Sequence, residues 1–176
     1  MLDTTQVPIG PGGRRELRFA TLDEMLGDAR ACVDADGASR LIRRGNWTIG
    51  QALHHIAAWI DYPLLGYPAE LVIPAEFQAQ ARAHKDRILR ETMRPGEKLP
   101  GLESAGGTLA TEAVSGAAGL AHIHEAAARL CAGEPGSPTP FADPAFGVIT
   151  YHDWTEMTLR HAELHLSFFV PSGTVR

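Results

Sequence analysis

Residues 46–60 read Asn46-Trp-Thr-Ile-Gly-Gln-Ala-Leu-His-His-Ile-Ala-Ala-Trp-Ile60, and this stretch decides the fold. Thr48 and Gln51 have the spacing of a capping box, in which each side chain accepts a hydrogen bond from the other residue's backbone amide. Apolar residues then recur at helical spacing, which predicts an amphipathic helix that ends near Pro63 and Gly66. The stripe that this helix would bury comprises Ile49, Leu53, Ile56, Trp59 and Ile60.

Similar patterns occur elsewhere in the chain. Thr21 and Thr150 each stand before an apolar helical stripe, with Glu24 and Asp153 three residues later. Another stripe runs from Leu120 until Gly133 stops it. Residues 74–93 predict a further, more polar helix with solvated arginines. These arginines, with one just beyond the helix, are Arg82, Arg87, Arg90 and Arg94.

The sequence therefore predicts an all-α fold, a four-helix bundle with an additional polar helix and two long loops. No segment shows the sustained alternation of a strand. The loops, at residues 95–119 and 134–147, are longer than bundle connections need, so we expect them to rim a pocket. We expect residues 1–13 to form a flexible arm, residues 14–170 a single helical-bundle domain, and residues 171–176 a tail.

Composition excludes several classes of protein. The chain has 176 residues and a net charge of -5, which disfavours nucleic-acid binding. Its first residues lack the pattern of a signal peptide, and no apolar run reaches the ~20 residues of a membrane helix. We therefore expect a cytoplasmic protein with no membrane partner. Its two cysteines, Cys32 and Cys131, fall in helical patterns and are predicted to be buried.

Eight histidines against two cysteines indicate that any metal would be held by imidazoles and carboxylates. His161 and His165 lie one turn apart on the buried face of the last helix, where both could reach one ion. His55 lies at the flank of the buried stripe of its own helix and could supply a third ligand. A pair of core histidines without a metal is the alternative. Of the other five histidines, we expect His54, His84 and His122 to face solvent, and His124 and His152 to lie at most near the metal site or a pocket.

Residues 46–57 resemble the second-helix signature of the DinB/YfiT-like metalloenzyme superfamily. In that signature a tryptophan and a capping Ser or Thr precede a metal-binding histidine, eight residues after the tryptophan. Counted from Trp47, this position is His55.

Residues 146–154 and 159–169 resemble the last helix of the same superfamily, and more narrowly an uncharacterised bacterial branch of it. The H-x-x-x-H motif of the superfamily falls on His161 and His165. Members of this branch often carry a histidine where this chain has Leu164. The resemblance extends from about residue 14 to residue 169 and is weakest in the middle.

This resemblance implies a four-helix bundle, often dimeric, that holds a divalent ion, typically zinc or nickel, on three histidines. Some members of the superfamily transfer or isomerise groups with low-molecular-weight thiols. Here it implies a metal site of His55, His161 and His165, a small-molecule substrate that could be such a thiol, and a homodimer.

Three histidine ligands leave a coordination position open for water or a substrate thiolate. We therefore expect a metal-dependent enzyme of the thiol transferase or hydrolase type. The alternative is a non-enzymatic binding or interaction module with a structural metal or none. Asp61, Glu125 and Glu156 are candidates to orient the ligands, since metal-binding histidines donate their second N–H to such groups. Arg90 and Arg94 are candidates to receive an anionic substrate.

Overall fold

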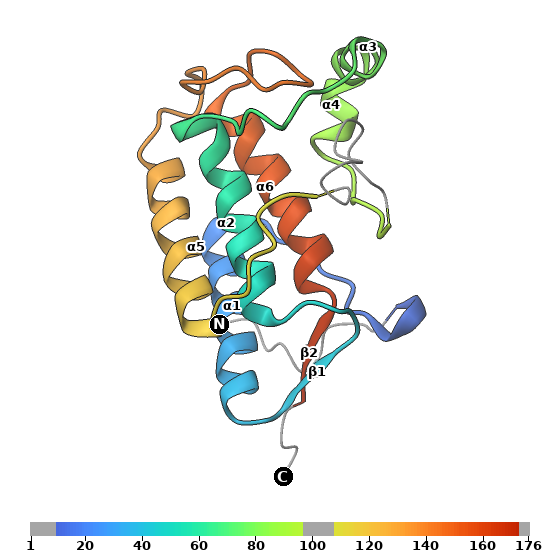
Figure 1. Cartoon of the computed structure of the whole chain (residues 1–176), viewed down its shortest axis with the longest axis vertical. Helices are drawn as coiled ribbons and strands as arrows, with labels where there is room; N and C mark the ends of the chain where they lie inside the picture. Colours follow the sequence, from blue (N-terminus) through green and yellow to red (C-terminus); the bar gives the residue numbers. More distant parts are fainter. Residues whose placement is uncertain (1–9, 97–107, 173–176) are drawn as a thin grey trace.

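The computed structural model describes residues 10–96 and 108–172, which are mostly helical with one small two-stranded sheet (Figure 1). The mostly helical prediction is confirmed. Residues 1–9 of the expected arm, 97–107 of the first long loop and 173–176 of the tail lie outside the described residues. The helices are α1 (Leu22–Gly37), α2 (Ile49–Leu65), α3 (Ala75–Ala83), α4 (Lys85–Ile88), α5 (Gly116–Cys131) and α6 (Tyr151–Leu166), and the strands are β1 (Leu41–Arg43) and β2 (Phe169–Pro171).

The helix starts predicted at Thr21, Thr48 and Thr150 are confirmed, whereas α5 begins at Gly116, inside the expected loop of residues 95–119. Thr48 and Gln51 form the complete capping box at α2, with N···O distances of 3.2 and 2.9 Å. Thr150 caps α6 by accepting a hydrogen bond from the Asp153 amide. The Asp153 carboxylate pairs with Lys85 of α4 at 2.8 Å, so it ties the short helix to α6 instead of completing a second box.

Four helices, α1, α2, α5 and α6, pack around a common apolar core (Figure 1). Helix α6 runs antiparallel to α2. Trp154, in the first turn of α6, donates its Nε1–H to the Ile60 carbonyl near the end of α2. The largest fully buried side chains of the core are Met25, Ile49, Leu53, Ile56, Ile60, Leu89, Ile123, Leu130, Ile149, Trp154 and Leu159.

Two glycines bring α2 and α5 into backbone contact. A Cβ atom on Gly119 would lie 2.6 Å from the Gly50 carbonyl oxygen, and one on Gly50 would lie 2.1 Å from the Val114 oxygen. Only residues without a side chain fit at these two positions, since real Cβ atoms do not approach so closely. The side chains that flank this contact on both helices are therefore held near one another.

The structure corrects two expectations. β1 and β2 form an antiparallel pair, with Leu41 opposite Pro171 and Arg43 opposite Phe169, so the fold is not purely α. Strands this short cannot show an alternating pattern in the sequence. The polar helix predicted over residues 74–93 is divided at His84, whose φ of -120° and ψ of 18° are not helical, into α3 and α4, and it ends at Ile88.

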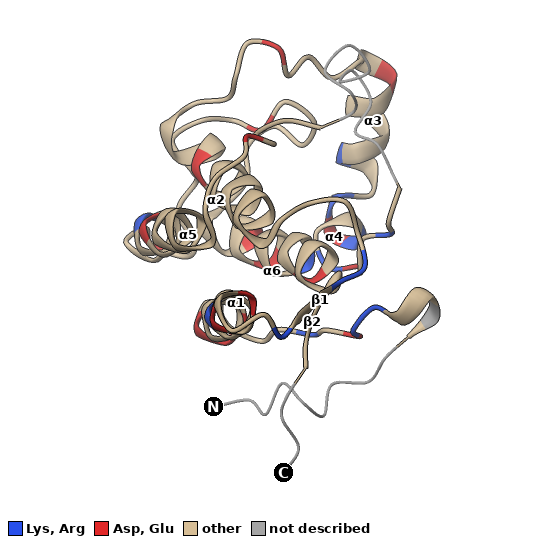
Figure 2. Cartoon of the chain, turned by 60° about the horizontal axis from the view of Figure 1, so that its bottom comes forward, with Lys and Arg blue, Asp and Glu red and all other residues tan. Residues whose placement is uncertain are grey.

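Charges are unevenly placed on the helices (Figure 2). Acidic residues lie on several turns of α1, whereas basic residues gather on the segment before α1 and around α4. The arginines of the polar segment are exposed, as predicted. No helix in the part of the chain that the structure describes is long and apolar enough to cross a membrane.

Candidate metal centre

The structure brings His55 of α2 together with His161 and His165 of α6. The Nε2 atom of His161 lies 3.1 Å from Nε2 of His55 and 3.0 Å from Nε2 of His165. One nitrogen from each ring lies within 4.8 Å of the other two, so this group could hold a metal ion. The antiparallel packing of α2 and α6 places His55 opposite the two histidines that α6 presents one turn apart.

The spacing of these nitrogens fits a shared ion. With metal–nitrogen bonds of about 2.0–2.1 Å, two ligand nitrogens lie about 2.9 Å apart at a right angle and about 3.3 Å apart at a tetrahedral angle. The separations of 3.1 and 3.0 Å fall between these values. Two of the three separations therefore match those of ligands on one divalent ion, and imidazoles suit zinc and nickel.

The ring of His55 is oriented by a backbone group. Its Nδ1–H donates to the carbonyl oxygen of Leu109 at 2.7 Å, which leaves the Nε2 lone pair directed at the other two histidines. Among the described residues, none of the expected carboxylates, Asp61, Glu125 and Glu156, makes a hydrogen bond with His55. Asp61 binds His122 and Arg129, and Glu125 is exposed on α5. The sequence offers no signal for Leu109, because any loop residue can supply a carbonyl.

Burial keeps all three imidazoles neutral. Desolvation lowers the pKa of His55 to about 4 and that of His165 to about 3. The pKa of His161 lies well below its ordinary value, through desolvation and then through its two neighbours. A metal ion therefore need not displace protons from these rings at neutral pH.

Two tryptophans surround the histidines. Trp47 stacks on His165 with ring centroids 5.1 Å apart and planes at 4°, and it meets His55 edge-on at 5.0 Å. Trp59 lies edge-on to His55 at 6.0 Å and to His161 at 5.8 Å. These rings limit the rotation of the imidazoles and exclude water from one side of the cluster.

The three histidines lie in the wall of an open pocket of about 940 Å³. Residues of both long loops line it, including Thr108 and Phe146, which agrees with the expected position of the loops. Most of the wall is apolar. Its polar lining outside the three histidines includes Asn46, Gln80, His84, Arg87, Arg94, Thr108 and Thr158.

Other expectations need correction. His54 and His122 were predicted to face solvent, yet their Nδ1 atoms lie 3.0 Å apart. His124, which was placed beside the buried stripe of α5, is exposed. His84 and His152 are also exposed, although His84 lines the pocket. Cys32 is buried as predicted, whereas Cys131 is exposed.

Arg90 and Arg94 differ in their relation to the pocket. Arg94 lines it, as does Arg87, which the sequence placed only among the solvated arginines of the polar helix. Arg90 instead approaches Asp86 on its own segment at 3.7 Å, and its carbonyl accepts from Arg18.

Comparison with known proteins gives a family without an assigned activity. A family model described as "Protein of unknown function (DUF1569)" matches residues 12–172. Searches of the curated proteins and of the solved structures found no match. The matched region includes helices α1 to α6, strands β1 and β2 and the three clustered histidines. The chain therefore belongs to the DUF1569 family.

Proposed function

We propose that this protein is a divalent-metal-dependent enzyme that acts on a small molecule, as a thiol transferase or a hydrolase. The observation that carries the proposal is the convergence of three neutral imidazole nitrogens in the wall of a large open pocket. A structural site is more often closed by four protein ligands, whereas a catalytic site keeps a position for water or substrate.

The donor set supports zinc or nickel as the resident ion. Imidazole nitrogen is a suitable ligand for both, and no thiolate takes part in the cluster. When bound, such an ion would lower the pKa of a water or thiol at its open position and so supply a nucleophile near pH 7.

The residues of the chain would then position the substrate. The apolar wall would bury the body of a small molecule and exclude bulk water from the reacting group. Arg87 and Arg94, which line the same pocket, carry positive charge that favours a substrate with an anionic group. Low-molecular-weight thiols with carboxylate groups have this combination of properties.

The helical arrangement also supports the proposed relationship to the DinB/YfiT-like superfamily. The packing of α1, α2, α5 and α6 around one core is compatible with a four-helix bundle. The three histidines lie on α2 and α6, the two helices whose sequences carry the resemblance. We propose a common fold and metal site on this basis.

Metal content tests the site. The metal-free protein would be reconstituted with Zn²⁺ or Ni²⁺, desalted, and measured by elemental mass spectrometry beside His161→Ala. We expect close to one ion per chain in the parent and little in the variant. His124→Ala, which removes an exposed histidine, should retain the ion. A parent that stays metal-free after reconstitution would overturn the proposal.

A second measurement separates an enzyme from a binding module. X-ray absorption spectroscopy of the loaded protein should show three imidazoles and at least one exchangeable light-atom ligand. The loaded protein would then be tested with glutathione-type thiols and electrophiles. A fourth, non-exchangeable protein ligand would exclude the open position and indicate a structural ion.

A further inference from the structure

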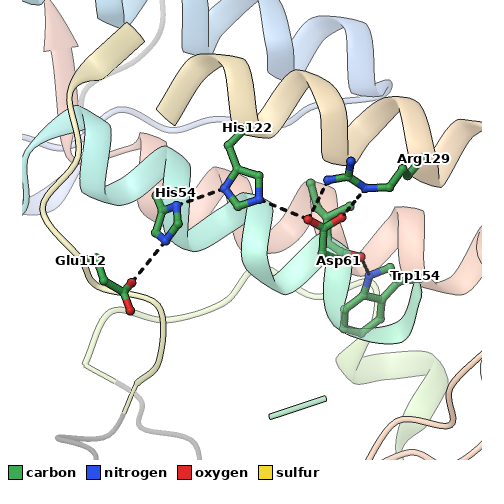
Figure 3. A network of polar contacts seen from close by, with 7 residues as sticks. His54, Asp61, Glu112, His122, Arg129 and Trp154 are labelled. Carbon is green, nitrogen blue, oxygen red and sulfur yellow. Dashed lines mark hydrogen bonds and ion pairs between the residues drawn. The ribbon is translucent and has the colours of Figure 1, made fainter. Parts of the chain in front are cut away.

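A second pair of histidines, His54 of α2 and His122 of α5, meets at the contact between α2 and α5 (Figure 3). Their Nδ1 atoms lie 3.0 Å apart and their ring centroids 5.0 Å apart. Both side chains are partly exposed, at 25% and 28%. Solvent and small ions can therefore reach the His54–His122 pair.

Helix packing fixes this pair in place. His54 lies one turn after Gly50, and His122 lies three residues after Gly119, the two glycines that bring α2 and α5 into contact. The contact continues two turns further along each helix, where Asp61 of α2 binds Arg129 of α5. The histidines are thus held by the two helices and not by flexible loops.

Each ring has a carboxylate on its far nitrogen. His122 Nε2 lies 3.2 Å from Asp61 Oδ2, and Arg129 holds the same carboxylate with two bonds of 2.9 and 2.8 Å. His54 Nε2 lies 3.2 Å from Glu112 Oε2. A carboxylate accepts hydrogen bonds, so both Nε2 atoms are donors and both Nδ1 atoms present lone pairs.

Two lone pairs that meet at 3.0 Å need a proton or a metal ion between them. The arrangement of carboxylate, histidine and a free nitrogen is the one that orients histidines toward metal ions in proteins. The separation also fits two nitrogens on one ion, for which about 2.9–3.3 Å is expected.

We propose that His54 and His122 form a second metal site, which binds one divalent ion such as Zn²⁺, Ni²⁺ or Cu²⁺ through their Nδ1 atoms. Water completes the coordination, because the pair is partly exposed. With two protein ligands, this site binds more weakly than one with three. The second site does not rest on the proposed enzymatic function, because none of the three clustered histidines is one of its ligands.

Calorimetric titration of the metal-free full-length protein with Zn²⁺ tests the proposal. We expect the parent to bind two equivalents of Zn²⁺, one with higher affinity than the other. His122→Ala should lose the weaker one and keep the stronger. His161→Ala/His165→Ala should show the reverse, so that the two sites can fail separately. His124→Ala, on the same helix, should keep both.

A spectroscopic test identifies the ligands directly. Cu²⁺ bound to His161→Ala/His165→Ala should give an electron paramagnetic resonance spectrum with hyperfine splitting from two imidazole nitrogens. Adding either His54→Ala or His122→Ala should remove this pattern, while circular dichroism shows that the helices remain. Two variants are used because either one alone could disturb the packing of α2 on α5.

Two outcomes would overturn the second site. A parent that binds a single equivalent, lost only with the α6 histidines, would show that the pair shares a proton and takes no metal. A weaker equivalent that persists in both His54→Ala and His122→Ala would place that ion elsewhere on the chain.

Discussion

At the scale of single residues, burial determines what the clustered histidines can do. His55 is 2% exposed, and its ring is held between a backbone carbonyl and two other imidazoles. Without an ion, the three imidazoles hold their polar nitrogens close together where little water reaches them. Protonating any one of the rings there is unfavourable, and this has a measurable effect on stability.

Metal-free protein should lose stability as the pH falls from about 6.5 to about 4. The pKa of His55 is about 4 and that of His165 about 3 when folded, against an ordinary value of 6.5. In this interval the unfolded chain binds more protons, and each histidine contributes a slope of about 1.4 kcal/mol per pH unit. Urea unfolding at pH 7 and pH 5 would measure it. If His165→Gln kept the full slope of the parent, this explanation would be wrong.

Residue patterns in the sequence were sufficient to select His55, His161 and His165, because both the helical spacing and the resemblance can be recognised within short segments of the sequence. The His54–His122 pair was missed for a physical reason. Each of these histidines does face away from the three-histidine cluster, but a single helix cannot show which other helix covers that face. Gly50 and Gly119 were the available signal, since a glycine within a helix lets the backbone of another helix approach closely.

At the scale of elements, α2 connects the two histidine groups. On one side it contacts α6, where His55 meets His161. On the other it contacts α5 through the glycines, where His54 meets His122. The adjacent histidines thus point into different interfaces, because successive residues on a helix are separated by about 100°.

Gly119→Ala should separate α2 from α5. The added methyl group would lie 2.6 Å from the Gly50 carbonyl oxygen and 3.0 Å from Leu53 Cβ. We expect a loss of about 1–3 kcal/mol in the free energy of unfolding, as for other overpacked sites. Gly27→Ala is the matched control, because nothing lies within 4 Å of its added methyl group in α1. There we expect a gain of about 0.5–1 kcal/mol.

Chemical denaturation of both variants provides the measurement. Equal stabilities for Gly119→Ala and Gly27→Ala would show that α2 and α5 can move apart without cost.

Helices with a clear capping residue and a clear apolar periodicity were predicted well. The short strands and the break in the polar helix, which have neither signal, were not. α2 and α6 begin at the capping threonines, since each cap satisfies a backbone amide locally. β1 pairs with β2 across more than a hundred residues, and such non-local pairing leaves no local pattern. The break at His84 also lacks a local signal, because neither glycine nor proline marks it.

At the scale of the whole molecule, the segment before α1 joins helices that are far apart in the sequence. Arg15 binds Asp28 of α1 with N···O distances of 2.5 and 2.8 Å, and it donates to the Leu166 carbonyl of α6 at 3.0 Å. Phe19 donates its backbone N–H to Glu163 at 2.6 Å. The histidines of α6 therefore depend on contacts made by the beginning of the domain.

Arg15→Met should destabilise the protein by about 3–5 kcal/mol, because it leaves the Asp28 carboxylate buried without its cationic partner. Arg15 and Asp28 are only 3% and 4% exposed. Replacing both members, as Arg15→Met/Asp28→Leu, should recover much of that loss, since an apolar pair of similar volume leaves no unpaired charge. Urea unfolding of the two variants at pH 7 measures the difference. A single variant as stable as the parent would show that this ion pair does not hold the segment to α1 and α6. A double variant no better than the single would show that the loss does not come from the unpaired Asp28 carboxylate.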